Sequence, residues 1–132
     1  MNALLAHTPR FVLMNGKQRI GPQLERSDSD PPSVSIYAFS DKSFYDQFRT
    51  NSPVALTPYP LVKDYLQSQI SDSNNAAGLI VVDAAGPNES HLNAATMQSV
   101  LAAMETKDDH VAISCRLDLV DKSSGIFAIN TQ

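Results

Sequence analysis

An unbroken apolar run from Leu79 to Val82 is the clearest hydrophobic signal in the chain. Four apolar residues in a row, mostly β-branched, are too few for a helix and are typical of a central strand buried on both faces. Asp83 closes the run, and Gly86 and Pro87 predict a turn after it. Because other elements must pack on both faces of such a strand, the remaining segments are expected to pair beside it or to pack against it.

Four other segments are predicted strands: residues 11–14, 34–39, 111–119 and 126–130. Residues 34–39 and 111–119 alternate between apolar and polar side chains, as half-buried strands do, whereas residues 11–14 form a short apolar run. Asn15-Gly16 after the first is a strong hairpin signal, and residues 17–20 are expected to return as an edge strand. The last two segments are separated by a turn, which predicts an antiparallel C-terminal hairpin.

Two helices are expected between the second strand and the central one. Ser40 or Asp41 is predicted to cap the first, which places Phe44 and Phe48 four residues apart on one face. The second is predicted over residues 61–70, introduced by residues 57–60, with an apolar stripe on one side.

A third helix is expected after the central strand, with Asn93 as its cap and Leu92 packing on Met97 as a hydrophobic staple. Its apolar stripe is Met97, Val100, Leu101 and Met104. This stripe is interpreted as core packing, although a stripe containing methionine can also line a promiscuous groove.

Composition agrees with one folded domain. The chain has 132 residues, 42% hydrophobic and 18% charged, which is a globular balance. We therefore predict a single α+β domain over residues 1–132, with a mixed or antiparallel sheet packed against about three helices and a C-terminal β-hairpin. The segment over residues 21–33 is rich in Pro, Ser and charge; it is expected to be a mobile connector, with a recognition lid as the alternative.

Charge and cysteine content indicate the compartment and limit the partners. The net charge of −4 and the scattered basic residues argue against a nucleic-acid surface. No stretch approaches the roughly 18 apolar residues of a membrane span, and the first eleven residues lack the basic start of a secretory signal. A single cysteine, Cys115, cannot form an internal disulfide, so we expect a cytoplasmic protein.

The familiar catalytic and cofactor motifs are missing from the sequence. There is no phosphate-binding glycine loop and no GxSxG elbow. Cys115 lies on the apolar face of its strand, where a thiol is usually a small hydrophobe. His7, His91 and His110 are far apart in the sequence and lack the spacing of metal ligands, and Asp109 precedes the last of them in a polar turn. No metal and no cofactor is expected.

The best candidate site follows the central strand. Asp83, Asn88, Glu89 and His91 fall within nine residues around the Gly-Pro turn. Ligand sites favour loops at the carboxyl ends of buried strands, and a carboxylate beside an imidazole can transfer protons. The structural alternative is that Asp83 accepts hydrogen bonds from the turn's own backbone amides.

The order of these signals is similar to that of a known family. A short FVLM strand and an Asn-Gly turn lead to VSIYAFSDKSFYDQF, VALTPYPLVKDYL and GLIVVDAAGP. Over about residues 10–105 this resembles the N-terminal domain of the SseB-like (enhanced serine sensitivity) proteins. Members show an FTS step where this chain has Phe39-Ser40-Asp41, and often NPG where it has the 83–87 turn. The resemblance implies a small bacterial cytosolic domain without catalytic residues, with residues 106–132 as an appended hairpin.

The leading hypothesis is therefore a non-enzymatic binding or adaptor domain that contacts a protein partner or forms a homodimer through its C-terminal strands. The alternative is a small-molecule or metabolic protein with a site at Asp83, Glu89 and His91. A third, recognition of a toxin, is compatible with the acidic charge of the chain.

Overall fold

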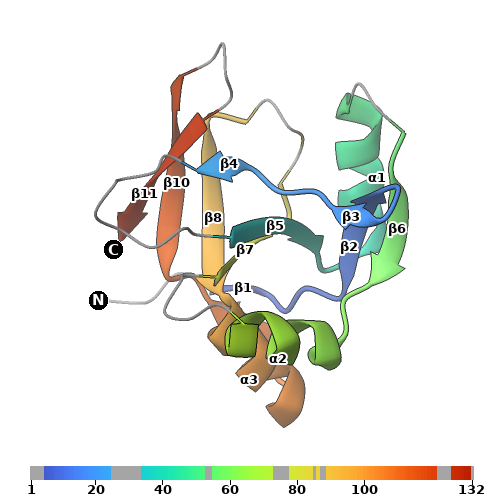
Figure 1. Cartoon of the computed structure of the whole chain (residues 1–132), viewed down its shortest axis with the longest axis vertical. Helices are drawn as coiled ribbons and strands as arrows, with labels where there is room; N and C mark the ends of the chain where they lie inside the picture. Colours follow the sequence, from blue (N-terminus) through green and yellow to red (C-terminus); the bar gives the residue numbers. More distant parts are fainter. Residues whose placement is uncertain are drawn as a thin grey trace.

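Eleven short strands and three helices make up the described part of the chain, which in this computed structural model comprises residues 5–24, 34–52, 55–72, 78–84, 86, 89–121 and 126–131 (Figure 1). The helices are α1 (Lys42–Asn51), α2 (Lys63–Asp72) and α3 (Met97–Thr106). The strands are β1 (Leu5–His7), β2 (Phe11–Asn15), β3 (Gln18–Arg19), β4 (Gln23–Leu24), β5 (Val34–Phe39), β6 (Thr57–Pro60), β7 (Gly78–Val82), β8 (His91–Thr96), β9 (His110–Ala112), β10 (Cys115–Asp121) and β11 (Ile126–Thr131). The predicted α+β class and C-terminal hairpin are confirmed.

β7 occupies the middle of the main sheet, as its apolar run predicts. The strand order is β3-β2-β5-β7-β8-β10-β11-β4, with β7 parallel to β5 and antiparallel to β8. Leu79 and Val81 face one hydrophobic cluster, and Ile80 and Val82 face the other, with at most 7% of any of the four exposed. Full burial of such a side chain stabilises the fold by about 1.5–3 kcal/mol.

The two end strands of the sheet, β3 and β4, are consecutive in the chain. β4 pairs in parallel with β11. The segment that connects β3 to β4 crosses β5. There the Tyr37 amide donates to the Ile20 carbonyl at 2.9 Å, and the Ser35 hydroxyl donates to the Pro22 carbonyl at 2.8 Å. A Cβ on Gly21 would lie 1.8 Å from the Ser35 oxygen, so only glycine permits this crossing.

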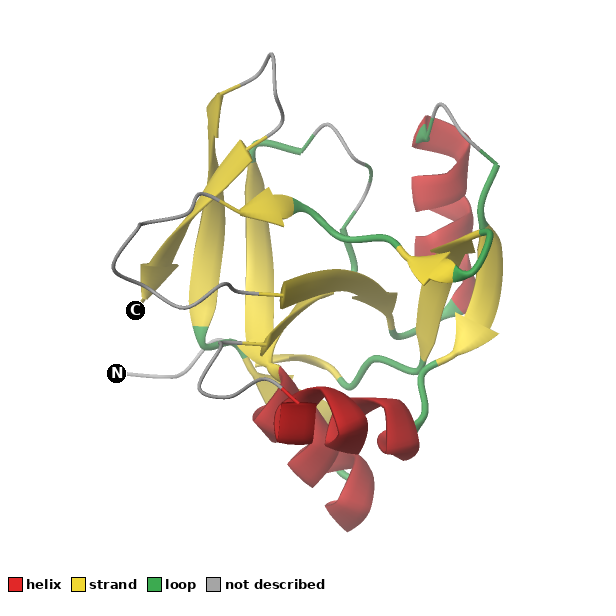
Figure 2. Cartoon of the chain, viewed as in Figure 1, coloured by secondary structure: helices red, strands yellow, loops and turns green. Residues whose placement is uncertain are grey.

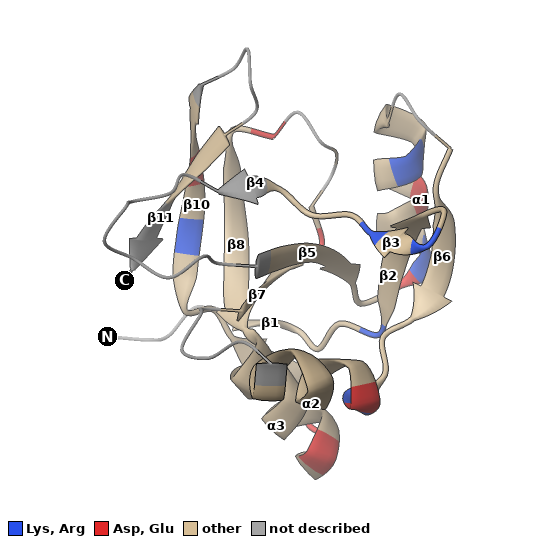
Figure 3. Cartoon of the chain, viewed as in Figure 1, with Lys and Arg blue, Asp and Glu red and all other residues tan. Residues whose placement is uncertain are grey.

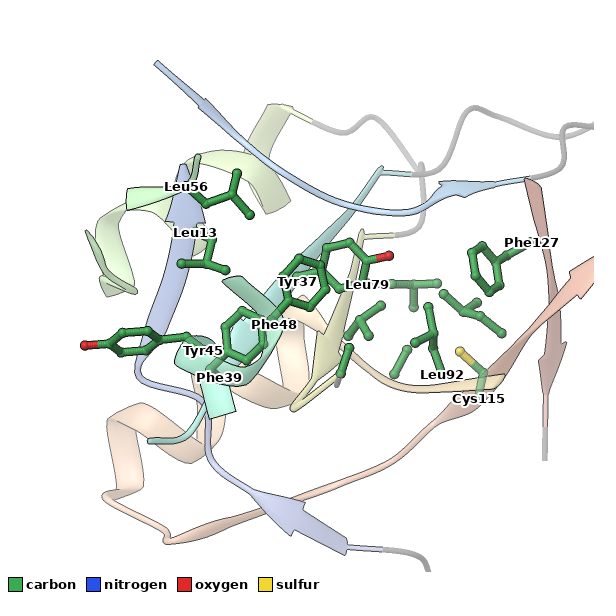
Figure 4. Packing of buried hydrophobic residues seen from close by; sticks show 14 residues of the cluster. Leu13, Tyr37, Phe39, Tyr45, Phe48, Leu56, Leu79, Leu92, Cys115 and Phe127 are labelled. Atoms are coloured by element: carbon green, nitrogen blue, oxygen red, sulfur yellow. The ribbon is translucent and has the colours of Figure 1, made fainter. Parts of the chain in front are cut away.

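The two faces of the sheet carry separate hydrophobic clusters. The inner cluster fills the concave side and contacts α1 (Figure 4). It comprises Leu13, Tyr37, Phe39, Tyr45, Phe48, Leu56, Leu79, Val81, Ala84, Leu92, Ala94, Cys115, Leu117 and Phe127. The outer cluster includes side chains of α2 and α3. Figure 2 shows these two helices together on one side of the sheet. The outer cluster comprises Val12, Ile36, Ala38, Leu61, Leu66, Ile80, Val82, Ala95, Met97, Val100, Ala103, Val111 and Ile113.

The first two predicted helices are present, with small differences at their ends. Phe44 and Phe48 of α1 both pack on the inner cluster. Asp41 holds the N-cap position, but its side chain caps no helix amide and accepts instead from the Ser43 hydroxyl at 3.0 Å. α2 begins two residues later than expected because residues 57–60 form β6, an edge strand beside β2 where prolines are tolerated.

The third helix begins later than its sequence suggests, and the predicted cap is wrong. Asn93 lies inside β8, which pairs with both β7 and β10. The cap is Thr96, whose hydroxyl accepts from the Ser99 amide at 3.1 Å. Leu92 belongs to the inner cluster and Met97 to the outer one, so the predicted staple between them does not exist. Pairing on both sides outweighs the weak strand propensity of the alanines in β8.

The long alternating segment over residues 111–119 is two strands rather than one. β9 ends at Ala112 and pairs with β1, while β10 starts at Cys115 and belongs to the main sheet. Val111 therefore packs in the outer cluster and Leu117 in the inner one, although both have the same sequence parity. Residues 25–33, most of the predicted connector or lid, lie outside the described residues. Within the described ranges, no helix is long and apolar enough to cross a bilayer.

Candidate functional site

Asp83 binds the neighbouring strand instead of projecting toward a ligand. Its two carboxylate oxygens accept hydrogen bonds from the amide and the hydroxyl of Ser40, each at 2.8 Å. Its own amide donates to the Ala38 carbonyl at 2.9 Å. These bonds hold Asp83 at a φ of 55°, a left-handed conformation that Asp tolerates better than most residues.

The Asp83 carboxylate therefore links the carboxyl ends of two parallel strands, β7 and β5, just before α1 begins. The sequence offers the alternative that Asp83 accepts hydrogen bonds from amides of its own turn. Asp83 does accept from a backbone amide, but this amide belongs to Ser40, directly after β5. Both oxygens of the Asp83 carboxylate thus hold Ser40 in place.

His91 forms a different pair, on the exposed face of β8 and β10. Its Nδ1 lies 2.6 Å from Oδ1 of Asp118, the residue directly opposite it in the strand register. Arg116 contacts the same carboxylate, with Nε 2.9 Å from Oδ1. The hydrogen bond from His91, with help from Arg116, lowers the pKa of Asp118 below its usual value.

The other two residues of the predicted site add little to it. The Glu89 side chain is half-buried, and within the described part of the chain its carboxylate has no hydrogen bond or ion pair. Asn88 lies outside the described residues. The four predicted residues thus do not converge: Asp83 pairs with Ser40, and His91 pairs with Asp118.

A second polar region forms where the N-terminal segment crosses the end of α3. Residues 7–10, here called the strap, begin at the last residue of β1 and are held by hydrogen bonds on both sides. The Thr8 amide and hydroxyl donate to the carbonyls of Asp109 and Asp108 at 2.9 and 2.7 Å. The Arg10 amide donates to the Phe39 carbonyl, and the Arg10 carbonyl accepts from the Leu61 amide, both at 2.8 Å.

Two hollows adjoin along the strap and share Thr8, Arg10 and Asp109 as lining residues. The α1 hollow has a volume of about 470 Å³ and lies between the strap and the start of α1. The α3 hollow has a volume of about 360 Å³ and lies between the strap and the end of α3. Both volumes fall within the range of small-molecule sites.

The α1 hollow combines imidazoles, carboxylates and one aromatic ring. Its wall contains His7 and His110, whose rings face each other across the β1–β9 pair with centroids 4.8 Å apart. Asp41, Phe44 and Ser40 form the opposite wall at the carboxyl end of β5. Ser40 is the residue that Asp83 holds, so the predicted site residue acts on this hollow indirectly.

The α3 hollow is lined by basic side chains around an apolar floor. Arg10, Lys63 and Lys107 come from the strap, the first residue of α2 and the C-cap of α3. The floor includes Leu61 and Ala103, which are 5% and 6% exposed. Such a mixture can hold an apolar body while charged groups orient it.

The sequence alone did not identify these residues as a site. His7 and His110 are 103 positions apart in the chain and meet only because β1 pairs with β9. The first residues gave no clear strand signal, so no pattern predicted that pairing. Among the described residues, no cluster of three or more His, Cys, Asp or Glu side chains is arranged to hold a metal ion.

Cys115 is buried on the inner side of β10, as its position in the alternating pattern predicts. Burial raises the pKa of its thiol, which reduces the fraction present as the reactive thiolate.

No known protein family, curated protein sequence or solved structure matches this chain in the three comparisons. The resemblance to the SseB-like proteins therefore stays a prediction.

Proposed function

We propose that this protein is a non-enzymatic binding module whose ligand occupies the groove formed by the two hollows along the strap. The observation that carries the proposal is the contrast in side-chain pairing. Of the residues predicted after β7, Asp83 is paired with Ser40 and His91 with Asp118. The groove instead presents His7, Arg10 and Asp109 at a surface hollow.

The backbone around the groove is well suited to a preformed site. The strap is hydrogen-bonded to β5 on one side and to residues 108–109 on the other. These bonds fix the backbone from which its side chains project. The Asp83–Ser40 bonds fix the opposite wall in the same way. A site that is ordered before binding loses less conformational entropy when a ligand binds.

A thermal-shift screen against amino acids, nucleotides, organic acids and sugar phosphates tests this proposal. A ligand that binds only the folded state is expected to raise the melting temperature by several degrees at saturating concentration. The double variant Arg10→Ala/Asp109→Ala, changed in two exposed residues shared by both hollows, should lose that shift.

Lys17→Ala is the matched control, because Lys17 is also exposed but lies in the β2–β3 turn. It should keep the full shift. Ligands that stabilise the double variant as much as the unmodified protein would contradict the proposal, since they would bind elsewhere.

Self-association through β11 is a second candidate, supported by one observation. β11 runs over Ile126–Thr131, but β4 pairs with it only at Ile126 and Phe127. The backbone of residues 128–131 therefore has a neighbour on the β10 side alone among the described strands. An open strand edge can pair with the same edge of a second copy.

Light scattering over a range of protein concentrations tests this second candidate. A dimer held by strand pairing should give a mass that rises toward twice 14.3 kDa, together with intermolecular proton contacts between β11 strands in isotope-mixed NMR samples. A constant monomer mass up to millimolar concentration would exclude it.

A further inference from the structure

Some basic residues of the described chain form ion pairs or ring contacts and others do not; Figure 3 colours lysine and arginine blue. Eight lysines and arginines are described, and three of them, Lys42, Arg49 and Arg116, form ion pairs with aspartates. Arg19 lies over the ring of Tyr65, 3.7 Å from its centroid. The four described basic residues without an ion pair or ring contact are Arg10, Lys17, Lys63 and Lys107. Three of these four line the α3 hollow.

Local structure accounts for only one of these three cations, because Lys107 lies at the C-terminal end of α3, where the helix dipole favours positive charge. Lys63 is the first residue of α2, at the helix end where the dipole disfavours a cation. Lys107 caps α3 in the left-handed conformation at a φ of 59°, and Arg10 belongs to the strap. Three separate elements thus bring like charges to one hollow, in a protein whose net charge is −4.

The carboxylates beside the hollow only partly balance these cations. Asp108 and Asp109 also line it, and one Asp108 oxygen already accepts from the Thr106 hydroxyl at 2.7 Å. Three positive charges against two negative ones leave an excess of positive charge. Clustered charge of one sign in a concave surface concentrates ligands of the opposite sign.

We propose that the α3 hollow binds a small organic anion that has a carboxylate or phosphate head and a short apolar body. The head would be held by Arg10, Lys63 and Lys107, and the body would lie on Leu61, Ala103 and Met104. Arg suits planar or tetrahedral oxyanions because its guanidinium donates two parallel hydrogen bonds. This inference rests on the proposed function and names the ligand class for one half of the groove.

NMR titration of the ¹⁵N-labelled protein with octanoate, octyl phosphate and 1-octanol tests the inference. The two anions should shift the amide signals of Arg10, Ala103 and Lys107, while octanol, with the same body but no charge, should bind much more weakly. The variant Arg10→Gln/Lys107→Gln should weaken the anions by about tenfold or more, the loss expected for charge-assisted hydrogen bonds. Lys17→Gln, which removes a cation outside the hollow, should leave affinity unchanged.

Three results would overturn the inference: no shift from either anion at millimolar concentration, equal binding of octanol, or equal loss of affinity in Lys17→Gln. The single variants Arg10→Gln and Lys107→Gln are titrated as well, so a misfolded double variant cannot obscure the outcome. If the anions fail while a ligand from the thermal-shift screen still depends on Arg10 and Asp109, only the ligand class is wrong. If that dependence fails too, the groove itself is not a binding site.

Discussion

The loop after β7 and the groove along the strap contain similar types of residue but differ in how their side chains are paired. Each has aspartates and a histidine close to the carboxyl end of a parallel strand. In the loop region, the Asp83 carboxylate binds Ser40, and His91 binds Asp118. In the groove, Arg10 has no ion pair within the described structure and lines both hollows. The polar residues that are close in sequence after β7 are therefore paired with residues elsewhere in the chain, and the two hollows are likewise assembled from distant segments but keep Arg10 without such a pair among the described residues.

Removal of the Asp83 carboxylate should have the largest effect, because it supports both the loop and the wall of the groove. Asp83→Ala loses two hydrogen bonds to Ser40 and places alanine at a positive φ, so we expect a loss of about 2–3 kcal/mol in the free energy of unfolding. Urea denaturation measures it. Asp83→Asn, which tolerates the left-handed conformation, should lose less. A loss below about 0.5 kcal/mol in Asp83→Ala would mean that these bonds are not structural.

A smaller effect is expected at the strap. The Thr8 side chain is 8% exposed, and its hydroxyl donates to the Asp108 carbonyl. Thr8→Val keeps the shape but removes this donor, which should cost about 1 kcal/mol and increase hydrogen exchange in β1 and β9.

Thr8→Ser retains the hydroxyl and serves as the control for the strap. It should restore the exchange protection that Thr8→Val loses. Unchanged exchange in β1 and β9 of Thr8→Val would show that the strap is held by its backbone bonds alone.

The smallest effect should be the pH response of the His91–Asp118 pair. The pKa of Asp118 is lowered in the folded state, so its contribution to stability is present above the unfolded pKa, near 4, and is lost as pH falls through the lower folded value. Both groups face solvent, so salt should weaken the effect. NMR titration of the Asp118 carboxyl carbon measures this pKa, and His91→Gln should move it upward. No movement would assign the lowering to Arg116 instead.

Much of the architecture was predictable because its signals are local. The apolar run of β7, the Asn15-Gly16 turn and the aromatic pair of α1 depend on residues within a few positions of each other. β8 was not predictable, since its alanines favour a strand only between two partners that lie elsewhere in the sequence. The bend between β9 and β10 is likewise set by pairing with β1.

The candidate site was less predictable than the fold. Asp83 and His91 were rightly placed at the end of the central strand, but sequence cannot show that each finds a partner in another strand. From the sequence, Asp109 was predicted only as part of a polar turn, and His7 and His110 only as isolated histidines. Their meeting depends on long-range strand pairing, for which the sequence carries no local pattern.

The strap has a consequence for synthesis of the chain. Thr8 is synthesised about one hundred residues before its carbonyl partners, Asp108 and Asp109. Contacts at such separation form late, because a long loop must close before they stabilise anything. A nascent chain shorter than about residue 110 would already hold the central strand but neither hollow. Both hollows would thus form only after residues 108–110 have been synthesised, later than the contacts of the central strand.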